Sequence, residues 1–191
     1  MAKRAPGERR KEILQTLASM LENPKGEKIT TALLAAKLDV SEAALYRHFA
    51  SKAQMFEGLI EFIEESVFSL VNQIQAEETD GTKQIEKIVA MLLAFAQKNQ
   101  GMTRVLIGDA LVNEDERLQA RVNQMHDRLE SSIRQSTRLA MTAGALSGLD
   151  ANAYANAVMA FVIGRWHQFA KSGFKKSPIE SLPLSWQVFA G

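Results

Sequence analysis

The segment ITTALLAAKLDVSEAALYRHFASK, residues 29–52, decides how the N-terminal part of the chain folds. It contains three residues of the kind that cap helix N-termini, Thr30, Ser41 and Ser51, and each precedes a run of residues that favour helix. Gln54 follows Ser51 by three residues, which predicts a capping box at the start of the last of these helices. Helices are expected at residues 8–22, 31–38, 42–49 and from residue 52 to residue 76.

The turn between residues 31–38 and 42–49 is very short. It leaves too little chain for the two helices to lie side by side, so they must cross steeply, as in a helix-turn-helix unit. Val40 and Leu45 flank the Ser41 cap and can form a hydrophobic staple that fixes the entry into the second helix. The shared core is expected to contain Leu38, Val40, Leu45 and Phe49, with the small Ala35 at the crossing.

Polar and small side chains are left on the outside once Leu45 and Phe49 point inward. Two alanines would let the helix backbone settle into the major groove of DNA, where they can touch thymine methyl groups. Arg47 can reach a phosphate or a guanine edge. Tyr46 and His48 can donate hydrogen bonds to phosphate oxygens. This second helix is therefore a candidate recognition helix.

The starts of the neighbouring helices add to this surface. Thr30 and Thr31 place hydroxyl and free N–H groups at a helix N-terminus, where phosphates bind, and Lys52 brings a positive charge to the next one. The alternative is a three-helix packing unit with incidental polar residues. The candidate DNA-binding residues are Thr30, Thr31, Ser41, Glu42, Ala43, Ala44, Tyr46, Arg47, His48 and Lys52.

Charge is distributed unevenly along the chain, although the net charge is only +1. Residues 1–52 contain 10 Lys and Arg against 6 Asp and Glu, whereas the remaining residues contain 13 against 16. A basic N-terminal part on an acidic body is typical of a protein that binds a polyanion, and the alternative is a chance asymmetry of charges on a solvated surface.

Hydrophobic residues keep helical spacing through the rest of the chain, and no alternating strand pattern is present. The chain is therefore predicted to be all-α. Short helices give way to long ones near residue 52, which predicts a helix-turn-helix domain with a basic tail at residues 1–52 and a larger helical domain at residues 53–191. Gly101 is expected to cap the C-terminus of the helix before it. Further helices are expected at residues 82–98, 102–112, 115–141, 151–171 and 184–189.

Catalysis, cofactors and metals have no support in the sequence. There is no cysteine, and His48, His126 and His167 lie on different helices without the spacing of a zinc site. No glycine-rich loop follows a strand, so nucleotide binding is not expected. The longest apolar run, residues 88–96, is far shorter than the roughly 20 residues of a membrane-spanning helix. We expect a cytoplasmic protein that is not an enzyme.

The same segment resembles the N-terminal domain of the TetR family of DNA-binding proteins. The family pattern of V-S, then L-Y-x-H-F, then lysine is matched by Val40, Ser41, Leu45, Tyr46, His48, Phe49 and Lys52. Two residues depart from it. Asp39 replaces a usual glycine at the turn, where aspartate can adopt the left-handed conformation at modest cost, and Ala50 replaces a frequent proline. The resemblance implies a TetR-like fold with a larger helical dimerisation domain.

Residues 41–67 and 92–130 carry a closer likeness, to the nucleoid occlusion factors of this family, which runs from about Arg9 to near the C-terminus and weakens after about Arg138. It implies a nucleoid-associated homodimer that binds palindromic chromosomal sites, with more than one dimer per site possible. It also implies that the DNA-bound protein binds the division protein FtsZ and antagonises its assembly. The FtsZ C-terminal tail would dock between the helices at residues 52–76 and 82–98. The alternative function is a ligand-responsive repressor with a polar cavity in its body, and we do not expect such a ligand.

Helical periodicity leaves some side chains available for such a groove. The apolar stripe of residues 52–76 includes Leu70, whereas Phe62 lies roughly 120° from its centre. Met91 and Lys98 flank the stripe of the next helix. Periodicity alone equally allows Phe62 and Met91 to pack against a neighbouring helix. The candidate FtsZ-binding residues are Phe62, Glu65, Ser69, Met91, Ala94, Lys98 and Asn99.

Dimerisation is expected because one helix-turn-helix unit makes few contacts. A dimer places two recognition helices about 34–36 Å apart, in successive major grooves of a palindrome. We expect the interface on the helices at residues 115–141 and 151–171, where small residues allow close approach. The candidate interface residues are Ala157, Phe161 and Gly164, with Ala160 nearby.

Overall fold

The computed structural model describes residues 6–23 and 29–190, and the regular structure of these residues is entirely helical. The all-α prediction is confirmed. The helices are α1 (Pro6–Leu21), α2 (Thr31–Lys37), α3 (Glu42–Tyr46), α4 (Lys52–Glu77), α5 (Gly81–Lys98), α6 (Gln100–Leu106), the 3-10 turn η1 (Asp109–Leu111), α7 (Glu116–Thr142), α8 (Ala151–Lys171) and α9 (Leu182–Ala190).

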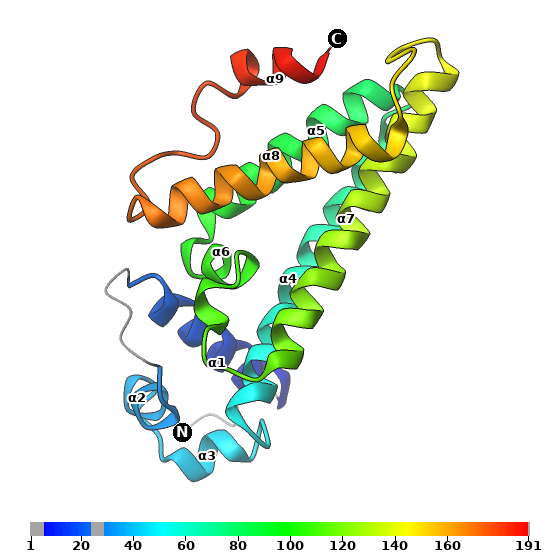
Figure 1. Ribbon diagram of the computed structural model, residues 1–191. Helices are drawn as coiled ribbons and strands as arrows, with labels where there is room; N and C mark the ends of the chain where they lie inside the picture. The colour runs from blue at the N-terminus through cyan, green and yellow to red at the C-terminus, as the bar shows by residue number, and fades with distance from the viewer. Residues whose placement is uncertain (1–5, 24–28, 191) are drawn as a thin grey trace.

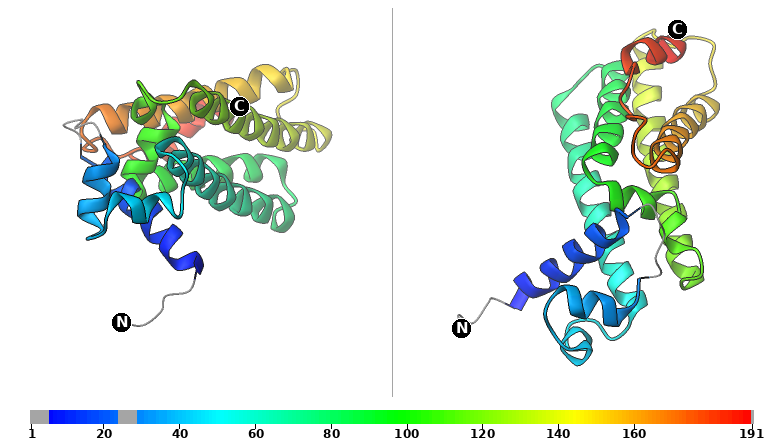
Figure 2. Two further views of the ribbon diagram at one scale, coloured as in Figure 1. Left: turned by 90° about the horizontal axis from the view of Figure 1, so that it is seen from below. Right: turned by 90° about the vertical axis from the view of Figure 1, so that its left-hand side faces the viewer.

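The molecule is elongated, with a small helical head at one end (Figure 1). We call α1, α2, α3 and the start of α4 the head, and the remaining helices the body. In the body, α7 packs against α4, α5 and α8. Figure 2 shows α9 at the end of the body opposite α2 and α3. Because α4 runs unbroken from the head into the body, the division into two domains at residue 52 stays a proposal.

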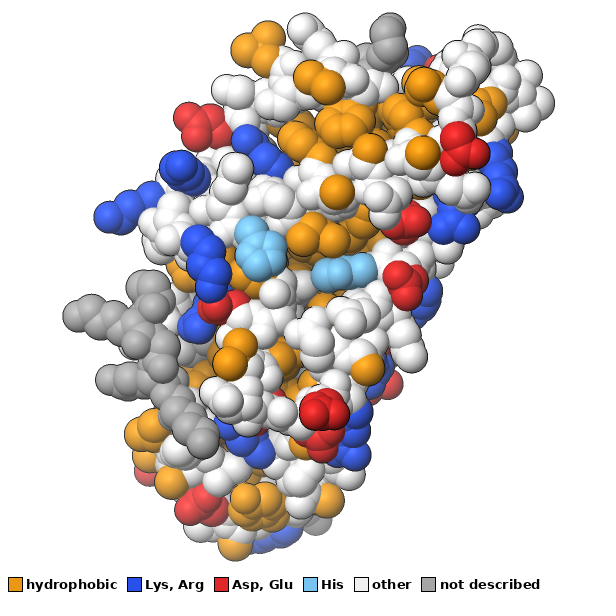
Figure 3. All heavy atoms as spheres, viewed as in Figure 1, with side chains coloured by type: hydrophobic (Ala, Val, Ile, Leu, Met, Phe, Trp, Pro, Cys, Tyr) orange, Lys and Arg blue, Asp and Glu red, His pale blue; other side chains and the backbone are white. Residues whose placement is uncertain are grey.

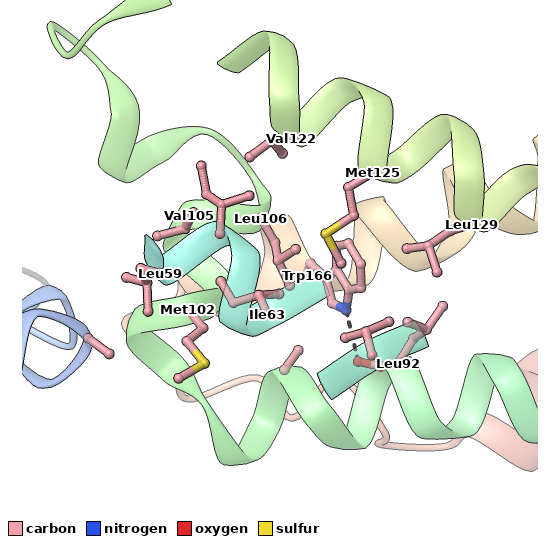
Figure 4. Close-up of a cluster of buried hydrophobic side chains, with 14 of the residues drawn as sticks. Leu59, Ile63, Leu92, Met102, Val105, Leu106, Val122, Met125, Leu129 and Trp166 are labelled. Carbon is pink, nitrogen blue, oxygen red and sulfur yellow. Dashed lines mark hydrogen bonds between the residues drawn. The ribbon is translucent and has the colours of Figure 1, made fainter. Parts of the chain in front are cut away.

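Trp166 of α8 fills the centre of the body. Its side chain is fully buried, and its indole Nε1 donates a hydrogen bond of 3.2 Å to the carbonyl oxygen of Leu92 in α5 (Figure 4). Met125 of α7 and Ile63 of α4 are buried around it in the same cluster. Four helices of the body are thus held by one aromatic side chain, whose burial contributes several kcal/mol, on the order of 3–5.

Gly101 does not cap α5, contrary to the prediction. It lies inside α6, where an added Cβ atom would be 1.9 Å from the carbonyl oxygen of Ala18 in α1. Glycine is therefore needed because the two backbones touch, not because a helix ends there.

Two predicted helices are too long. The one expected at residues 102–112 ends at Leu106, because Gly108 takes a left-handed conformation with φ 77° and redirects the chain. The recognition helix expected at residues 42–49 is α-helical as far as Tyr46 and then turns, with the Phe49 N–H donating to the Leu45 carbonyl. The other helices agree with the sequence to within a residue or two.

Candidate functional site

The predicted helix caps of the head are present. The Thr30 side chain accepts a hydrogen bond from the Leu33 N–H at 3.2 Å, and Ser41 accepts one from the Ala44 N–H at 3.3 Å. The third cap, at the start of α4, differs in one detail. Ser51 accepts from the Gln54 N–H, but the Gln54 side chain accepts from the Ala50 N–H instead of the Ser51 N–H. The three caps fix the starts of α2, α3 and α4.

The turn between α2 and α3 has the geometry that a left-handed aspartate provides. Asp39 has φ 54°, and the next residue, Val40, donates its N–H to the Ala35 carbonyl at 3.0 Å. Val40 and Leu38 are half-buried against the core, whereas Leu45 is fully buried. The turn therefore fixes the direction in which the chain enters α3.

Most of the predicted DNA-binding residues are exposed on the head. Tyr46 is 46% exposed, and Ala44 and His48 are half-buried. The exposed members of the set are Thr30, Ser41, Glu42, Ala43, Tyr46 and Arg47. Leu33 of α2, which the sequence did not single out, is 47% exposed on the same pair of helices. The surface combines hydroxyls, a guanidinium and small apolar groups, the set that contacts phosphates and base edges.

A short hydrogen-bond chain links α2 to α3 on this surface. The Thr31 hydroxyl donates to a Glu42 carboxylate oxygen at 2.5 Å, and the Tyr46 hydroxyl donates to the Thr31 oxygen at 3.4 Å. The single proton of each hydroxyl is thus engaged within the protein, so a phosphate contact by Thr31 or Tyr46 requires that phosphate replace the present acceptor. Nothing in the sequence shows this chain, because it joins residues 11 and 15 positions apart.

Lys52 does not present the free positive charge that was predicted at the start of α4. Its ammonium group forms an ion pair of 2.5 Å with Glu114, in the segment that leads into α7. It also lies 5.6 Å from the centre of the Phe56 ring, and its side chain is only 23% exposed. A phosphate contact by Lys52 stays a prediction, and it requires that phosphate compete with Glu114.

Arg10 of α1 is a residue of the head that the sequence did not single out. Its Nη1 donates to the His48 carbonyl oxygen at 2.7 Å, and its guanidinium lies 4.2 Å from the centre of the Phe49 ring. The run Glu8, Arg9, Arg10, Lys11 is the sequence signal for it. Arg10 ties α1 to the turn that follows α3.

The predicted FtsZ-binding residues do not all line one hollow. Phe62 and Glu65 of α4 line a pocket whose other walls are α1 and the start of α6. Met91 is half-buried against the core, and Lys98 is exposed near the end of α5. Ser69, Met91, Ala94, Lys98 and Asn99 are outside the lining of that pocket. The pocket therefore includes two of the predicted residues, and the role of the full set stays a prediction.

The predicted dimer face is an apolar stretch of α8. Ala157, Ala160 and Gly164 are exposed, and an added Cβ atom on Gly164 would meet no other atom within 4 Å. Phe161 is half-buried, with its ring centre 5.3 Å from that of Phe189 in α9. Figure 3 shows hydrophobic side chains gathered over α8, with the charged ones mainly at the margins of this face.

Comparison with known proteins shows to which family the chain belongs. A family model described as "Bacterial regulatory proteins, tetR family" matches residues 27–59, and one described as "Tetracyclin repressor-like, C-terminal domain" matches residues 79–191. A protein named nucleoid occlusion factor SlmA from Idiomarina loihiensis is 48% identical over 94% of this chain and 92% of its own length. A SlmA from Shewanella pealeana is 49% identical over 93% of this chain and 91% of its own. The chain belongs to the SlmA family.

Solved structures of more distant regulators share the fold of this SlmA family chain. A TetR transcription regulator from Haloarcula marismortui matches with a TM-score of 0.81 at 15% identity, covering 96% of this chain and 97% of that one. The fatty acid degradation regulator FadR from Bacillus halodurans matches with a TM-score of 0.78 at 14% identity, covering 100% and 97%. At such identities the likeness establishes a TetR-like fold alone.

Most buried polar atoms in this SlmA family chain have hydrogen-bond partners in the protein itself, and His126 Nε2 and Arg134 Nε are buried without one. Gln84 donates to two backbone carbonyls at 2.6 and 3.3 Å, and its side-chain oxygen accepts from the Ser136 hydroxyl at 2.7 Å. Thr103 and Thr137 donate to backbone carbonyls at 2.9 and 2.8 Å. These four are the polar residues of the described chain that are buried as a whole, and each has a hydrogen-bond partner in the protein.

The described residues were also compared with the requirements of a metal site and of a membrane-spanning helix. Within residues 6–23 and 29–190, no group of three or more His, Asp or Glu side chains is arranged to hold a metal ion. None of the helices in that part of the SlmA family chain has the length and apolar character needed to cross a bilayer. His126 of α7 is half-buried, and its ring centre lies 5.9 Å from that of Trp166.

Proposed function

We propose that this protein is a nucleoid occlusion factor. As a homodimer it binds palindromic chromosomal sites, and while bound to DNA it binds FtsZ and antagonises assembly of the division ring over the nucleoid. The observation that carries this proposal is that the likeness to SlmA proteins extends over more than nine-tenths of both chains, the body included. The protein acts in the cytoplasm on the nucleoid, as a regulator and not as an enzyme.

DNA recognition is the role of the head. Ala43 and Ala44 allow the backbone of α3 to enter the major groove, and Arg47 supplies a guanidinium for a guanine edge or a phosphate. The Thr31 and Tyr46 hydroxyls each have one proton, so they donate to phosphates by exchanging their present acceptors, Glu42 and the Thr31 oxygen, for phosphate oxygens. One such unit per protomer explains why the site is palindromic, and a long site accommodates more than one dimer.

FtsZ binding is the role of the face made by α4 and α5. Phe62 of α4 is half-buried and packs against the core, and Lys98 is exposed at the end of α5. An apolar patch with a basic end suits a short peptide that has hydrophobic and acidic groups.

The alternative function, a repressor released from DNA by a small molecule, requires inward-facing polar groups in the body. The four buried polar side chains of the described residues are already hydrogen bonded, and Trp166 occupies the centre of the body. These observations favour a body that supports a surface over a body that encloses a ligand.

The decisive experiment measures binding of a peptide copying the FtsZ C-terminal tail, with and without a specific DNA fragment. Fluorescence anisotropy should show tighter binding when DNA is present. Phe62→Ala should weaken binding by about tenfold or more, as expected when an aromatic anchor is removed, without loss of DNA binding. Lys98→Glu should weaken it in the same direction.

Phe68→Ala is the matched control on α4. The Phe68 ring is covered by the guanidinium of Arg128 at 3.9 Å and is therefore not free to contact a peptide. If Phe62→Ala and Lys98→Glu both bind the peptide as the unchanged protein does, the groove is assigned wrongly. If the unchanged protein binds neither the peptide nor intact FtsZ in a pull-down with DNA, the proposed function is wrong.

A further inference from the structure

Positive charge is concentrated near the end of α8, on a body that is otherwise acidic. Residues 151–179 form the longest stretch of the chain without Asp or Glu, and they contain Arg165, Lys171, Lys175 and Lys176. By contrast, residues 53–191 as a whole contain 13 Lys and Arg against 16 Asp and Glu. A local excess of cations on an acidic body is a candidate site for an anionic partner.

The turn after α8, residues 172–177, is held in one shape by its own hydrogen bonds, and we call it the α8 turn. Ser172 Oγ accepts from the N–H groups of Lys175 and Lys176 at 3.1 and 2.9 Å, and it donates to the Phe169 carbonyl at 2.8 Å. The Phe174 N–H donates to the same carbonyl at 2.9 Å, and the two phenyl ring centres are 5.1 Å apart. Because the backbone is already ordered, a partner that binds these lysines pays less conformational entropy.

The far end of the α8 turn is fixed to the body as well. Ser177 Oγ donates to Gln97 Oε1 of α5 at 2.8 Å, and Arg165 Nε donates to the Pro178 carbonyl at 2.9 Å. Arg165 also donates to the Glu180 carbonyl. Because the Arg165 guanidinium is engaged by these carbonyls, the cations left for a partner are the lysines.

The three lysines differ in what they contact. Lys175 and Lys176 are exposed, and neither forms an ion pair within the described part of the chain. Lys171 pairs with Asp109, which Arg104 of α6 also contacts at 2.8 Å, yet the Lys171 side chain is 61% exposed. These groups line a hollow of about 430 Å³ beside the α8 turn, in which two cations face one carboxylate. The hollow therefore adds to the positive charge of this surface.

The α8 turn lies apart from the recognition surface. In Figure 1 the end of α8 is at the side of the body, beside α6, whereas α2 and α3 are at the tip of the head. Figure 3 shows Lys and Arg side chains along the same edge of the body. A duplex that binds through α3 lies against the head, so it leaves the α8 turn open to another partner.

We propose that the α8 turn binds the phosphate backbone of a second DNA duplex while the head holds its own site. Lys175 and Lys176 contact phosphates directly, and Lys171 does so by exchanging Asp109 for a phosphate oxygen. A protein held on one DNA site is surrounded by neighbouring DNA at high effective concentration, so a few contacts are enough. Lysine contacts to phosphates carry no sequence information, so the second duplex can have any sequence.

This inference goes beyond the proposed function and does not depend on FtsZ. Each protomer of a dimer presents one α8 turn in addition to its recognition helix. The protein would therefore link separate segments of DNA, besides marking its own sites on the nucleoid.

Capture of a second duplex tests the proposal. A biotinylated duplex with a site that the protein selects from a random pool is immobilised and saturated with protein. Unbound protein is washed away, and a fluorescent duplex of unrelated sequence is added. The unchanged protein should retain the fluorescent duplex at about 50 mM salt. Its affinity should fall about 40-fold by about 200 mM salt if three phosphates are contacted.

Charge reversal in the α8 turn should remove this capture. The double variant Lys175→Glu with Lys176→Glu should bind the second duplex about tenfold more weakly or worse, and its affinity for the selected site should stay within about twofold. Lys175→Arg with Lys176→Arg should keep the capture, because the charges are kept. The matched control is Lys83→Glu with Lys87→Glu, since both lysines are exposed on α5.

This control makes the same change of net charge at a distance. Lys83 is near the start of α5 and Gln97, which contacts the α8 turn, is near its end. The helical rise separates them by roughly 20 Å, which exceeds the Debye length of about 10 Å at 0.1 M salt. The control should therefore capture the second duplex as the unchanged protein does.

The outcomes separate this inference from the proposed function. Full capture by the Lys175→Glu, Lys176→Glu variant would overturn the inference, and so would an equal loss in the α5 control, which would indicate general electrostatics. An unchanged protein that binds its selected site but captures no second duplex would also overturn it, while the proposed function stands. Capture of phosphatidylglycerol vesicles in place of the duplex would assign the α8 turn to a membrane surface instead. Failure to select any palindromic site would remove the proposed function itself.

Discussion

At the scale of single residues, Asp39 decides how sharply the chain turns between α2 and α3. Its φ of 54° lies in the left-handed region, which aspartate and asparagine tolerate better than other residues with a Cβ atom. Asp39→Ala should therefore lower the free energy of unfolding by about 1 kcal/mol, and Asp39→Asn should leave it nearly unchanged. Urea unfolding of the three proteins measures this. Equal stability of the alanine variant would show that the turn relaxes to another conformation.

His126 makes a second residue-scale prediction, on pH. Burial lowers the pKa of His126, a hydrogen bond to the Leu106 backbone and the charge of Asp127 oppose this, and His167 of α8 lowers it further. The pKa in the folded protein is therefore below that of the unfolded chain, about 6.5. Folding favours the neutral ring, so its contribution to stability is present above pH 6.5 and is lost as pH falls through the pKa of the folded protein.

Unfolding free energies measured from pH 7.5 to pH 5 should show this loss. The His126→Gln variant should lose less stability over that range than the unchanged protein, because glutamine does not titrate. His167→Gln is the control. Because His167 is exposed, this variant should keep most of the pH dependence of the unchanged protein. Identical slopes for the unchanged protein and His126→Gln would rule out the buried ring as the cause.

At the scale of elements, α6 and the segment between α6 and α7 join the body to the head. Glu114 pairs with Lys52, and Arg104 donates to the carbonyls of Leu21 and Asn23 at the end of α1 and to Asp109. Glu114→Gln should release the Lys52 ammonium group toward DNA. Affinity for all DNA sequences should then rise alike, and the slope of log K against log salt should steepen by about 0.9 for one added phosphate contact.

Asp115→Asn provides the control for that experiment. It makes the same change of charge one residue away, and asparagine can still cap α7 in place of the aspartate that accepts from the Arg117 N–H. The double variant Lys52→Met with Glu114→Gln should lose the gain. A steeper slope for Asp115→Asn as well would mean that net charge, and not Lys52, is responsible.

The sequence predicted elements well where their causes are local. The caps at Thr30, Ser41 and Ser51 and the left-handed turn at Asp39 depend on neighbours within a few residues, and all are present. It failed where the partner is distant. Lys52 is 62 positions from Glu114, and Gly101 is needed because α1 touches it. Leu70, expected in the core stripe of α4, is 40% exposed. Helical periodicity predicts which side of α4 is apolar, but not how much of that side the neighbouring helices cover.

The candidate site, too, was predictable only where its causes are local. The outward face of α3 was predictable because Leu45 and Phe49 of the same segment must point into the core. The pocket beside Phe62 was not, because its second wall is α1, which is distant in the sequence from α4. The role of Arg10 was not predicted for the same reason, since the His48 carbonyl to which it donates is 38 positions away. Contacts between elements depend on how helices cross, and helical periodicity does not specify the crossing.

At the scale of the whole molecule, the proposed dimer would allow two recognition helices to bind the two half-sites of one palindromic DNA site. The apolar stretch of α8 is open in the single chain, and a side chain at Gly164 would touch nothing within 4 Å. Gly164→Arg should therefore fold normally as a monomer, with a helix more stable by up to about 1 kcal/mol, while the bulky charge prevents pairing. Sedimentation at micromolar concentration should change from dimer to monomer, and binding to a palindrome should fall toward the level of a single half-site. Ala76→Arg, an equally large change on an exposed residue of α4, should leave both properties intact. A dimeric Gly164→Arg variant, or a monomeric unchanged protein, would place the interface elsewhere or remove it.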